Sequence, residues 1–500
     1  MEEFAAVEKQ IADWITTHFT IVILLGVGLL LTIVSRGVQV RMLPEMVRTV
    51  FGSRQGAKGG ISSFQAFAIS LAARVGVGNV FGVAAALLLG GPGAIFWMWV
   101  VALVGMATAF FEATLAQIFK VRHPDGAFRG GPAYYMKRGM RNRAMANVFA
   151  VITVLTCGVV ITSVQSNAIA GTLTEAFGEG ARQPLEGAGG FSAAQLTVAG
   201  LVFVFSAMVI FGGIRTVARV TEWMAPIMAL VYVVMVAVIC VLNIGQFGTV
   251  LGQIFTSAFS PEPLVGGLGG GILAAMVNGT QRGLFSNEAG QGTAPNAAAT
   301  ATVSHPVRQG LIQSLGVFID TIVVCTATAF VILIAGAEVW GGRGVNPSNL
   351  TTLAVSRELG AWTIVPMAVL VFVLAYSSIA AYVYSDTNMS FVFGGRAWAT
   401  WVVRVVCVAS ATAGALLSLD VVWNAVDIAM AVMTITNLIA LVILMRWGLG
   451  ALRDYQDQRR AGIADPVFVG EGNPLLPRDV PGRVWKRPKK SRARKPGSAG

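Results

Sequence analysis

The chain has 500 residues, of which 55% are hydrophobic and 12% charged, and its formal net charge is +12 at pH 7. So small a charged fraction excludes a soluble domain of this size, which needs more charge to cover its surface. Apolar runs of about 20 residues recur along the whole length, and each is long enough to cross about 30 Å of hydrocarbon. Composition therefore predicts an all-α polytopic membrane protein.

The N-terminal segment carries Glu2, Glu3, Glu8 and Asp13, whereas a cleavable signal peptide begins with basic residues. We therefore expect the first helix to remain in the mature protein. Hydropathy predicts about 11 transmembrane helices. They lie near 19–35, 64–90, 92–119, 146–174, 195–212, 223–244, 268–300, 308–335, 362–392, 400–419 and 423–446.

The lysines and arginines predict the orientation of these helices. With the N-terminus outside, nearly all basic residues fall on the inner side of the membrane. The exceptions are Lys9, Arg182, Arg343 and Arg357 outside, and Arg74 and Arg404 within spans. Because basic residues concentrate in cytosolic loops, we expect a plasma (inner) membrane protein with its N-terminus outside and its C-terminus in the cytosol.

The C-terminal segment KRPKKSRARK, which begins at Lys486, holds much of the excess positive charge. A basic run of this kind can bind nucleic acid or attract anionic lipid. It follows a stretch rich in Pro and Gly, from Gly462 onward, that is typical of a disordered cytosolic tail. We predict such a tail over 448–500, and no nucleic-acid partner.

Two of the predicted spans, 64–90 and 268–300, are longer than the others and carry small or helix-breaking residues at mid-depth. With the first helix set aside, they occupy corresponding positions in two five-helix halves. Discontinuous helices in such positions are typical of inverted-repeat transporters. We therefore predict an outer tail, extra helix and cytosolic loop over 1–60, a 5+5 repeat over 61–245 and 246–447, and the tail.

The first discontinuous helix contains RVGVGNVFG, with three glycines and Asn79 near its middle. An unwound turn there would free amides at the start of the second half-helix, which carries partial positive charge. We predict that the amides of Val77, Gly78 and Asn79 bind a substrate carboxylate. Ordinary packing is the alternative, since Gly78 and Gly82 also form a G-x-x-x-G pair.

Freed carbonyls at the end of the first half-helix, around Ala72 and Val75, have the oxygen chemistry that a desolvated Na⁺ needs. Arg74 precedes the break, and a charge at this depth requires water or a partner. We expect it to gate the inner vestibule or to extend toward the interface. We do not expect it to contact the substrate.

In the second discontinuous helix, Asn278, Gly279 and Thr280 are three poor helix formers together. We predict a break there that places Met276, Asn278 and Gly279 at the substrate. Carbonyls near Met276 to Asn278 would bind a substrate ammonium, and the inner half-helix would start near Gln281. Glu288 follows it. A carboxylate within a membrane is either functional or paired with a basic residue, and both interpretations stand.

Four sequence blocks closely resemble the alanine or glycine:cation symporter family. They are SLAARVGVGN (Ser70–Asn79), GGPGAIFWMWVVALVG (Gly90–Gly105), FRGGPAYYM (Phe128–Met136) and RGLFSNEAGQGTAPNAAA (Arg282–Ala299). The resemblance implies an eleven-helix protein with the leucine-transporter type of inverted repeat. It also implies Na⁺-driven uptake of alanine, glycine or a similar small neutral amino acid, with no organic cofactor.

The resemblance also extends to single residues. It implies that Gln165 contacts substrate, which we favour over the alternative that this amide bonds a neighbouring helix. It implies Ser377 and Ser378 as Na⁺ ligands that complete a shell begun by carbonyls of the first broken helix. We also expect Tyr382 to line the substrate pocket. The family usually has Trp at this position, in a window ending WYYGE that reads YVYSD here, so the pocket shape is expected to differ.

Other function classes fit the sequence less well. His18, His123 and His305 lie in loops or at helix ends, and no His–carboxylate or Cys/His cluster recurs within a span, which argues against an enzyme. Rings of charge or a repeated carbonyl filter, typical of ion channels, are missing from the sequence. Proton coupling is the closer alternative, because Arg74 and Glu288 could support it. The sequence does not predict an oligomeric state.

Overall fold

The computed structural model describes residues 2–52, 61–123, 126–176, 180, 183–185, 190–261, 271–340, 345–417 and 419–486. Helices make up most of this part of the chain. The one sheet within it pairs β1 (Val121–Arg122) with β2 (Phe128–Arg129) in antiparallel register, with Val121 opposite Arg129. The predicted all-α fold is confirmed.

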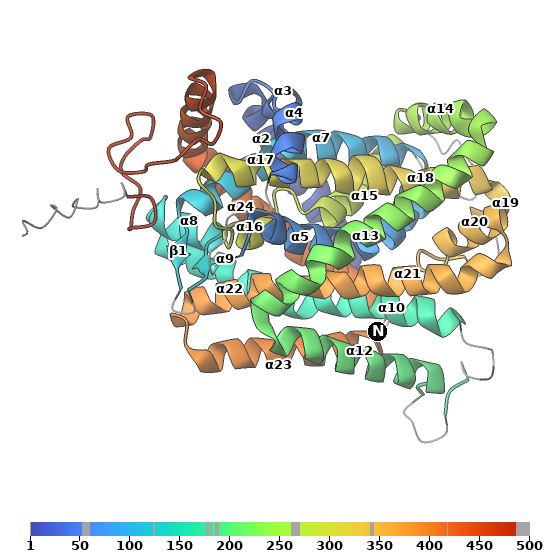
Figure 1. Cartoon of the computed structure of the whole chain (residues 1–500). Helices are drawn as coiled ribbons and strands as arrows, with labels where there is room; N and C mark the ends of the chain where they lie inside the picture. Colours follow the sequence, from blue (N-terminus) through green and yellow to red (C-terminus); the bar gives the residue numbers. More distant parts are fainter. Residues whose placement is uncertain are drawn as a thin grey trace, which may run out of the picture.

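The helices run largely side by side along one direction of the molecule (Figure 1). The helices before residue 260 are α1 (Glu2–Ile15), α2 (Ile21–Val34), α3 (Val38–Arg41), α4 (Leu43–Phe51), α5 (Ser63–Arg74), α6 (Val83–Gly90), α7 (Gly93–Ile118), α8 (Pro132–Arg138), α9 (Arg143–Leu155), α10 (Thr162–Ala176), α12 (Ala193–Phe211), α13 (Gly213–Leu242) and α14 (Phe247–Ala258).

A second set of helices follows residue 270. It comprises α15 (Ile272–Asn287), α16 (Ala294–Ala298), α17 (Pro306–Val317), α18 (Thr326–Ala335), α19 (Ala337–Trp340), α20 (Leu350–Leu359), α21 (Ile364–Ser377), α22 (Tyr382–Phe393), α23 (Ala397–Gly414) and α24 (Leu419–Arg460). Segments of π-helix join some of these elements, at Thr16–Thr20, Gly78–Gly82, Thr156–Ile161 and Phe318–Cys325.

Among the described residues, eight helices are long and apolar enough to cross a membrane, and the bent pair of Ser63–Arg74 and Gly78–Gly90 raises the number to nine. The multi-pass prediction is confirmed. In the predicted spans 268–300 and 362–392, the longest helices are α15 with 16 residues and α21 with 14. Both are shorter than the eight helices counted above. The count of eleven and the 5+5 repeat therefore stay predictions.

The C-terminal region contradicts the predicted disordered tail. Residues up to Arg460 continue α24, and residues 461–486, the C-terminal strap, fold back over one end of the helix bundle. The Phe468 amide donates to the Ser304 carbonyl at 3.0 Å, and Trp485 Nε1 donates to the Gln117 carbonyl at 2.9 Å. These contacts of Phe468 and Trp485 order a segment whose charge and Pro/Gly content favour disorder. Residues 487–500 lie outside the described residues.

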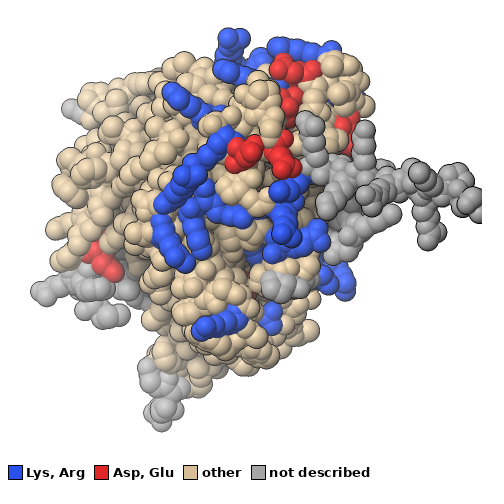
Figure 2. Space-filling view, turned by 90° about the vertical axis from the view of Figure 1, so that its left-hand side faces the viewer, with Lys and Arg blue, Asp and Glu red and all other residues tan. Residues whose placement is uncertain are grey.

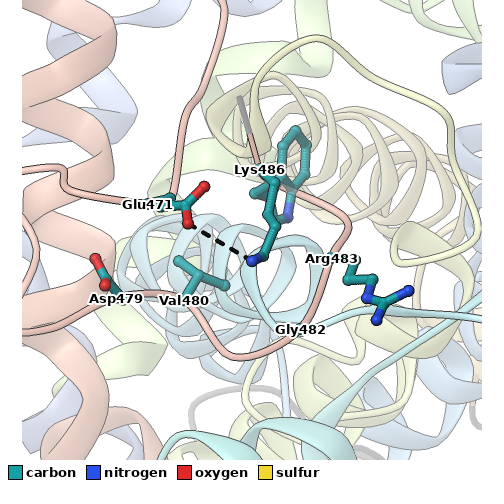
Figure 3. A pocket seen from close by; sticks show the side chains of 7 residues that line it. Glu471, Asp479, Val480, Gly482, Arg483 and Lys486 are labelled. Atoms are coloured by element: carbon teal, nitrogen blue, oxygen red, sulfur yellow. Dashed lines mark ion pairs between the residues drawn. The ribbon is translucent and has the colours of Figure 1, made fainter. Parts of the chain in front are cut away.

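The strap encloses a shallow hollow of about 370 Å³ (Figure 3). Its lining consists of Glu471, Asp479, Val480, Gly482, Arg483, Trp485 and Lys486. Glu471 and Lys486 form an ion pair of 3.5 Å across it, and both side chains are about half exposed. None of these residues belongs to the discontinuous helices, so the strap is separate from the candidate site described next.

Candidate functional site

The first discontinuous helix is interrupted where the sequence predicts. Helix α5 begins at a capping box formed by Ser62 and Gln65 and ends at Arg74. Val75 leaves the helical conformation with φ −73° and ψ 85°, and helix resumes at Gly78 on an axis bent by 46°. All residues from Ser70 to Gly82 are buried. The break therefore lies inside the bundle, as a binding site between broken helices requires.

Side chains pair the backbone amides that the break releases. In a continuous helix the amides of Gly76 and Val77 would bond carbonyls four residues earlier. Here the Gly76 amide donates to Asn79 Oδ1 at 3.0 Å, and the Val77 amide donates to Gln165 Oε1 at 3.3 Å. The structure thus brings Gln165 of α10 to the break, and Gln165 accepts from an amide that we predict to bind the carboxylate.

A buried polar cluster that the sequence analysis missed lies beside this break. Asn79 Nδ2 donates to Asp320 Oδ1 at 2.7 Å and to Ser286 Oγ at 3.2 Å. Asp320 Oδ2 accepts from the hydroxyls of Ser286 at 2.7 Å and Thr321 at 2.8 Å. Asp320 is fully buried. No ion pair to it is found among the described residues, although Arg74 is close enough to interact with its charge.

The second break lies about ten residues later than predicted. Helix α15 is continuous from Ile272 to Asn287, so Met276, Asn278 and Gly279 are ordinary helical residues. Asn278 Nδ2 donates to the Ala274 carbonyl at 3.0 Å within this helix. A Cβ at Gly279 would lie 2.4 Å from the Ala94 carbonyl oxygen, so this glycine permits close contact with α7. Packing of this kind outweighs weak helix propensity.

Helix α15 instead ends at Asn287, and the next residue, Glu288, adopts a left-handed conformation with φ 55°. Helix returns at Ala294, the first residue of α16. Glu288 Oε2 accepts from Thr293 Oγ1 at 3.0 Å and from the Tyr384 hydroxyl at 3.3 Å. Its partners in the described structure are hydroxyl groups, and the alternative of a direct pair with a basic residue is not observed there.

Two buried arginines have positions that differ from expectation. Arg74 is 2% exposed and its Nη1 donates to the Gln313 carbonyl at 3.3 Å, so the guanidinium does not reach the interface. Arg282, which we counted among the basic residues of the inner side, lies within α15 and forms a 2.5 Å ion pair with Asp427 of α24. The Asp427 carboxylate compensates for the hydration that the Arg282 guanidinium loses inside the helix bundle.

The remaining predicted ligands are Ser377, Ser378 and Tyr382. The side chains of Ser377 and Ser378 lie outside the described residues, so their Na⁺ role stays a prediction. The Tyr382 hydroxyl lies beside Gly213 at the start of α13, and no hydrogen-bond partner for it occurs in the described structure. Tyr384, two residues later and on another face of α22, reaches the second break instead.

Comparison with known proteins identifies the family. The model of the sodium:alanine symporter family matches residues 1–470. The chain belongs to this family. Among its relatives, the amino-acid carrier protein AlsT of Bacillus subtilis is 42% identical over 91% of this chain and 92% of its own. The sodium/alanine symporter AgcS of Methanococcus maripaludis is 35% identical over 88% of this chain and 95% of its own.

A third relative of this family member is the probable sodium/glutamine symporter GlnT of Bacillus subtilis, which is 42% identical over 91% of both chains. The family and its named members are transporters, so the protein is not an enzyme. Among solved structures, MhsT in complex with L-phenylalanine has a TM-score of 0.55 at 14% identity, covering 79% of this chain and 91% of that one. This likeness shows that the two share a fold.

Proposed function

We propose that this family member couples Na⁺ to the uptake of small neutral amino acids, alanine or glycine, by alternating access. One observation supports this most. The N-terminal end of the second half-helix, at Gly78, lies against the C-terminal end of α15, where a Cβ at Gly78 would be 3.1 Å from Ser286 Cα. One helix end carries partial positive charge and the other partial negative charge, so together they match an amino-acid zwitterion.

The carboxylate would bind the amides of Val77, Gly78 and Asn79. The Val77 amide, which donates to Gln165 Oε1 in this structure, would then donate to the substrate instead. The ammonium would bind carbonyls in the last turn of α15, because the predicted site near Met276 to Asn278 lies within continuous helix. Phe285 confines the space, since its Cδ1 would be 3.0 Å from a Cβ at Gly78. So little room favours a substrate with a small side chain.

Sodium would fit the oxygen-rich cluster at Asp320. The carboxylate of Asp320 and the hydroxyls of Ser286 and Thr321 are hard oxygen ligands, as a desolvated alkali cation requires. The carbonyls of Ala72 and Val75, with Ser377 and Ser378, make a second proposed group of ligands. Bound Na⁺ would offset the buried negative charge of Asp320.

The charge distribution supports the proposed orientation. Lysines and arginines gather on the end of the bundle formed by β1, α8 and the strap (Figure 2). Arg122, Lys137, Arg308 and Arg459 belong to this end. Because basic residues favour the cytosolic side, we propose that this face is cytosolic and that the protein resides in the plasma (inner) membrane.

Uptake by purified protein in proteoliposomes tests this function. With an inward Na⁺ gradient we expect alanine and glycine to accumulate above their external concentration, and with choline in place of Na⁺ we expect no accumulation. Alanine methyl ester, which lacks the carboxylate charge, should neither enter nor compete. Accumulation driven by a proton gradient in the absence of Na⁺ would indicate proton coupling instead, and strong competition by the ester would place the carboxylate elsewhere.

A further inference from the structure

Glu112 is a lone carboxylate in the C-terminal third of α7, in the apolar sequence AFFEATL, and it is 1% exposed. A carboxylate at such a depth requires partners that compensate the loss of hydration. The described structure gives it no direct ion pair. Its partners come instead from the second break, which lies about 180 positions further along the chain.

Both oxygens of Glu112 accept hydrogen bonds from that break. Oε2 accepts from the Gly290 amide at 3.2 Å, and Oε1 accepts from the Gly292 amide at 3.0 Å. These glycines have φ of 95° and 82°, a left-handed region that other residues rarely adopt. The turn between α15 and α16 thus directs the amides of two alternate residues at one side chain, while the Gln291 amide between them donates to the Glu288 carbonyl.

A second side chain fixes this arrangement. Asn437 of α24 donates from Nδ2 to Glu112 Oε1 at 2.5 Å and to the Gly290 carbonyl at 2.9 Å. The Tyr135 hydroxyl of α8 in turn donates to Asn437 Oδ1. The break is therefore attached to α7, α8 and α24 through donors and acceptors that are all paired.

We propose that Glu112 is a positioning residue that holds the second break, and through it directs Ser286 and Glu288 toward the transport site. An amide left unpaired inside the bundle would favour another turn conformation, because buried N–H groups must be bonded. A carboxylate provides two acceptors and no donor, so it alone among the polar side chains of this length pairs both glycine amides. This role in transport rests on the proposed function, whereas the holding of the break does not.

The test compares three variants of the full-length protein. Glu112→Gln keeps the shape of the side chain but has one oxygen in place of two, so one glycine amide loses its partner. We expect amide hydrogen exchange across residues 288–293 to become at least about tenfold faster, and the alanine concentration for half-maximal uptake to rise about tenfold. Glu112→Asp, with both oxygens on a shorter side chain, should restore part of each loss.

Thr114→Val is the matched control. It is isosteric, lies on the same helix, and removes a buried hydroxyl that has no hydrogen-bond partner in the described structure. The rate of amide hydrogen exchange and the alanine concentration for half-maximal uptake should both stay at wild-type values in this variant. If Glu112→Gln fails to fold, the test uses Glu112→Asp only. We then expect amide hydrogen exchange across residues 288–293 to be faster in Glu112→Asp than in the wild type.

Wild-type exchange rates in the Glu112 variants would overturn the proposal, and so would faster exchange with unchanged half-saturation. If the wild type itself shows no Na⁺-dependent uptake, the proposed function fails. The exchange measurement then still decides whether Glu112 holds the break, since it needs no transport.

Discussion

Replacing Gly78 by valine is expected to abolish alanine binding while the protein remains inserted and folded. A Cβ at this position would lie 3.0 Å from Phe285 Cδ1 and 3.1 Å from the backbone of Ser286. The two methyl groups of valine would then extend into the space between the helix ends, and a close-packed interior cannot absorb them. Binding of radiolabelled alanine to purified protein measures this, with size-exclusion chromatography to monitor folding.

Gly82→Ala is the control for this substitution. Gly82 lies one turn later on the same half-helix, and the nearest atom to a Cβ there is Phe285 Cδ1 at 3.9 Å, an ordinary contact. Alanine binding should be close to that of the wild type. Normal binding by Gly78→Val would show that the glycine run serves only helix packing.

Asp320→Asn is expected to lower the apparent affinity for Na⁺ by about tenfold or more, which corresponds to at least about 1.4 kcal/mol. The amide keeps one oxygen acceptor, so it retains either the bond from Asn79 or the bonds from Ser286 and Thr321, and it removes the negative charge that would balance the cation. At saturating Na⁺ the concentration of alanine needed for half-maximal uptake should change little. Uptake measured as a function of Na⁺ concentration separates the two quantities.

Asp386→Asn controls for the loss of a buried carboxylate as such. Asp386 lies on α22 and pairs with Arg129 at 3.4 Å. Its replacement should lower thermal stability, because it removes the negative partner of that buried arginine, but should leave the Na⁺ dependence unchanged. An unaltered Na⁺ dependence in Asp320→Asn would contradict the proposed cation site.

The sequence predicted the first break well because its cause is local. Glycines and Asn79 weaken the helix, and the Asn79 side chain pairs an amide only three residues away. The second break was misplaced because packing decided it. The helix passes through Asn278 and Gly279, where α7 comes close. It ends at Asn287, before Glu288, Gly290 and Gly292, which take left-handed conformations. Helix propensity cannot predict which carboxylate accepts hydrogen bonds from the Gly290 and Gly292 amides, because Glu112 lies on another helix.

Asp320 and Glu112 could have been found from the sequence. Each is a single acidic residue in an otherwise apolar run, FIDTIVV and AFFEATL, and an ionisable residue in a membrane segment is a functional candidate by default. Their partners could not have been found, because they lie on other helices. The strap was misjudged for a related reason. Phe468 and Trp485 anchor it through contacts with distant parts of the chain, and composition does not reveal them.

Alanine-driven uptake of radioactive sodium tests the central proposal most directly. Proteoliposomes hold equal Na⁺ concentrations on both sides, and alanine is added outside only. Because symport links the two fluxes, the inward alanine gradient should drive tracer Na⁺ into the vesicles, and Gly78→Val vesicles should show none. Alanine entry without any movement of Na⁺ in wild-type vesicles would contradict Na⁺ coupling at this site.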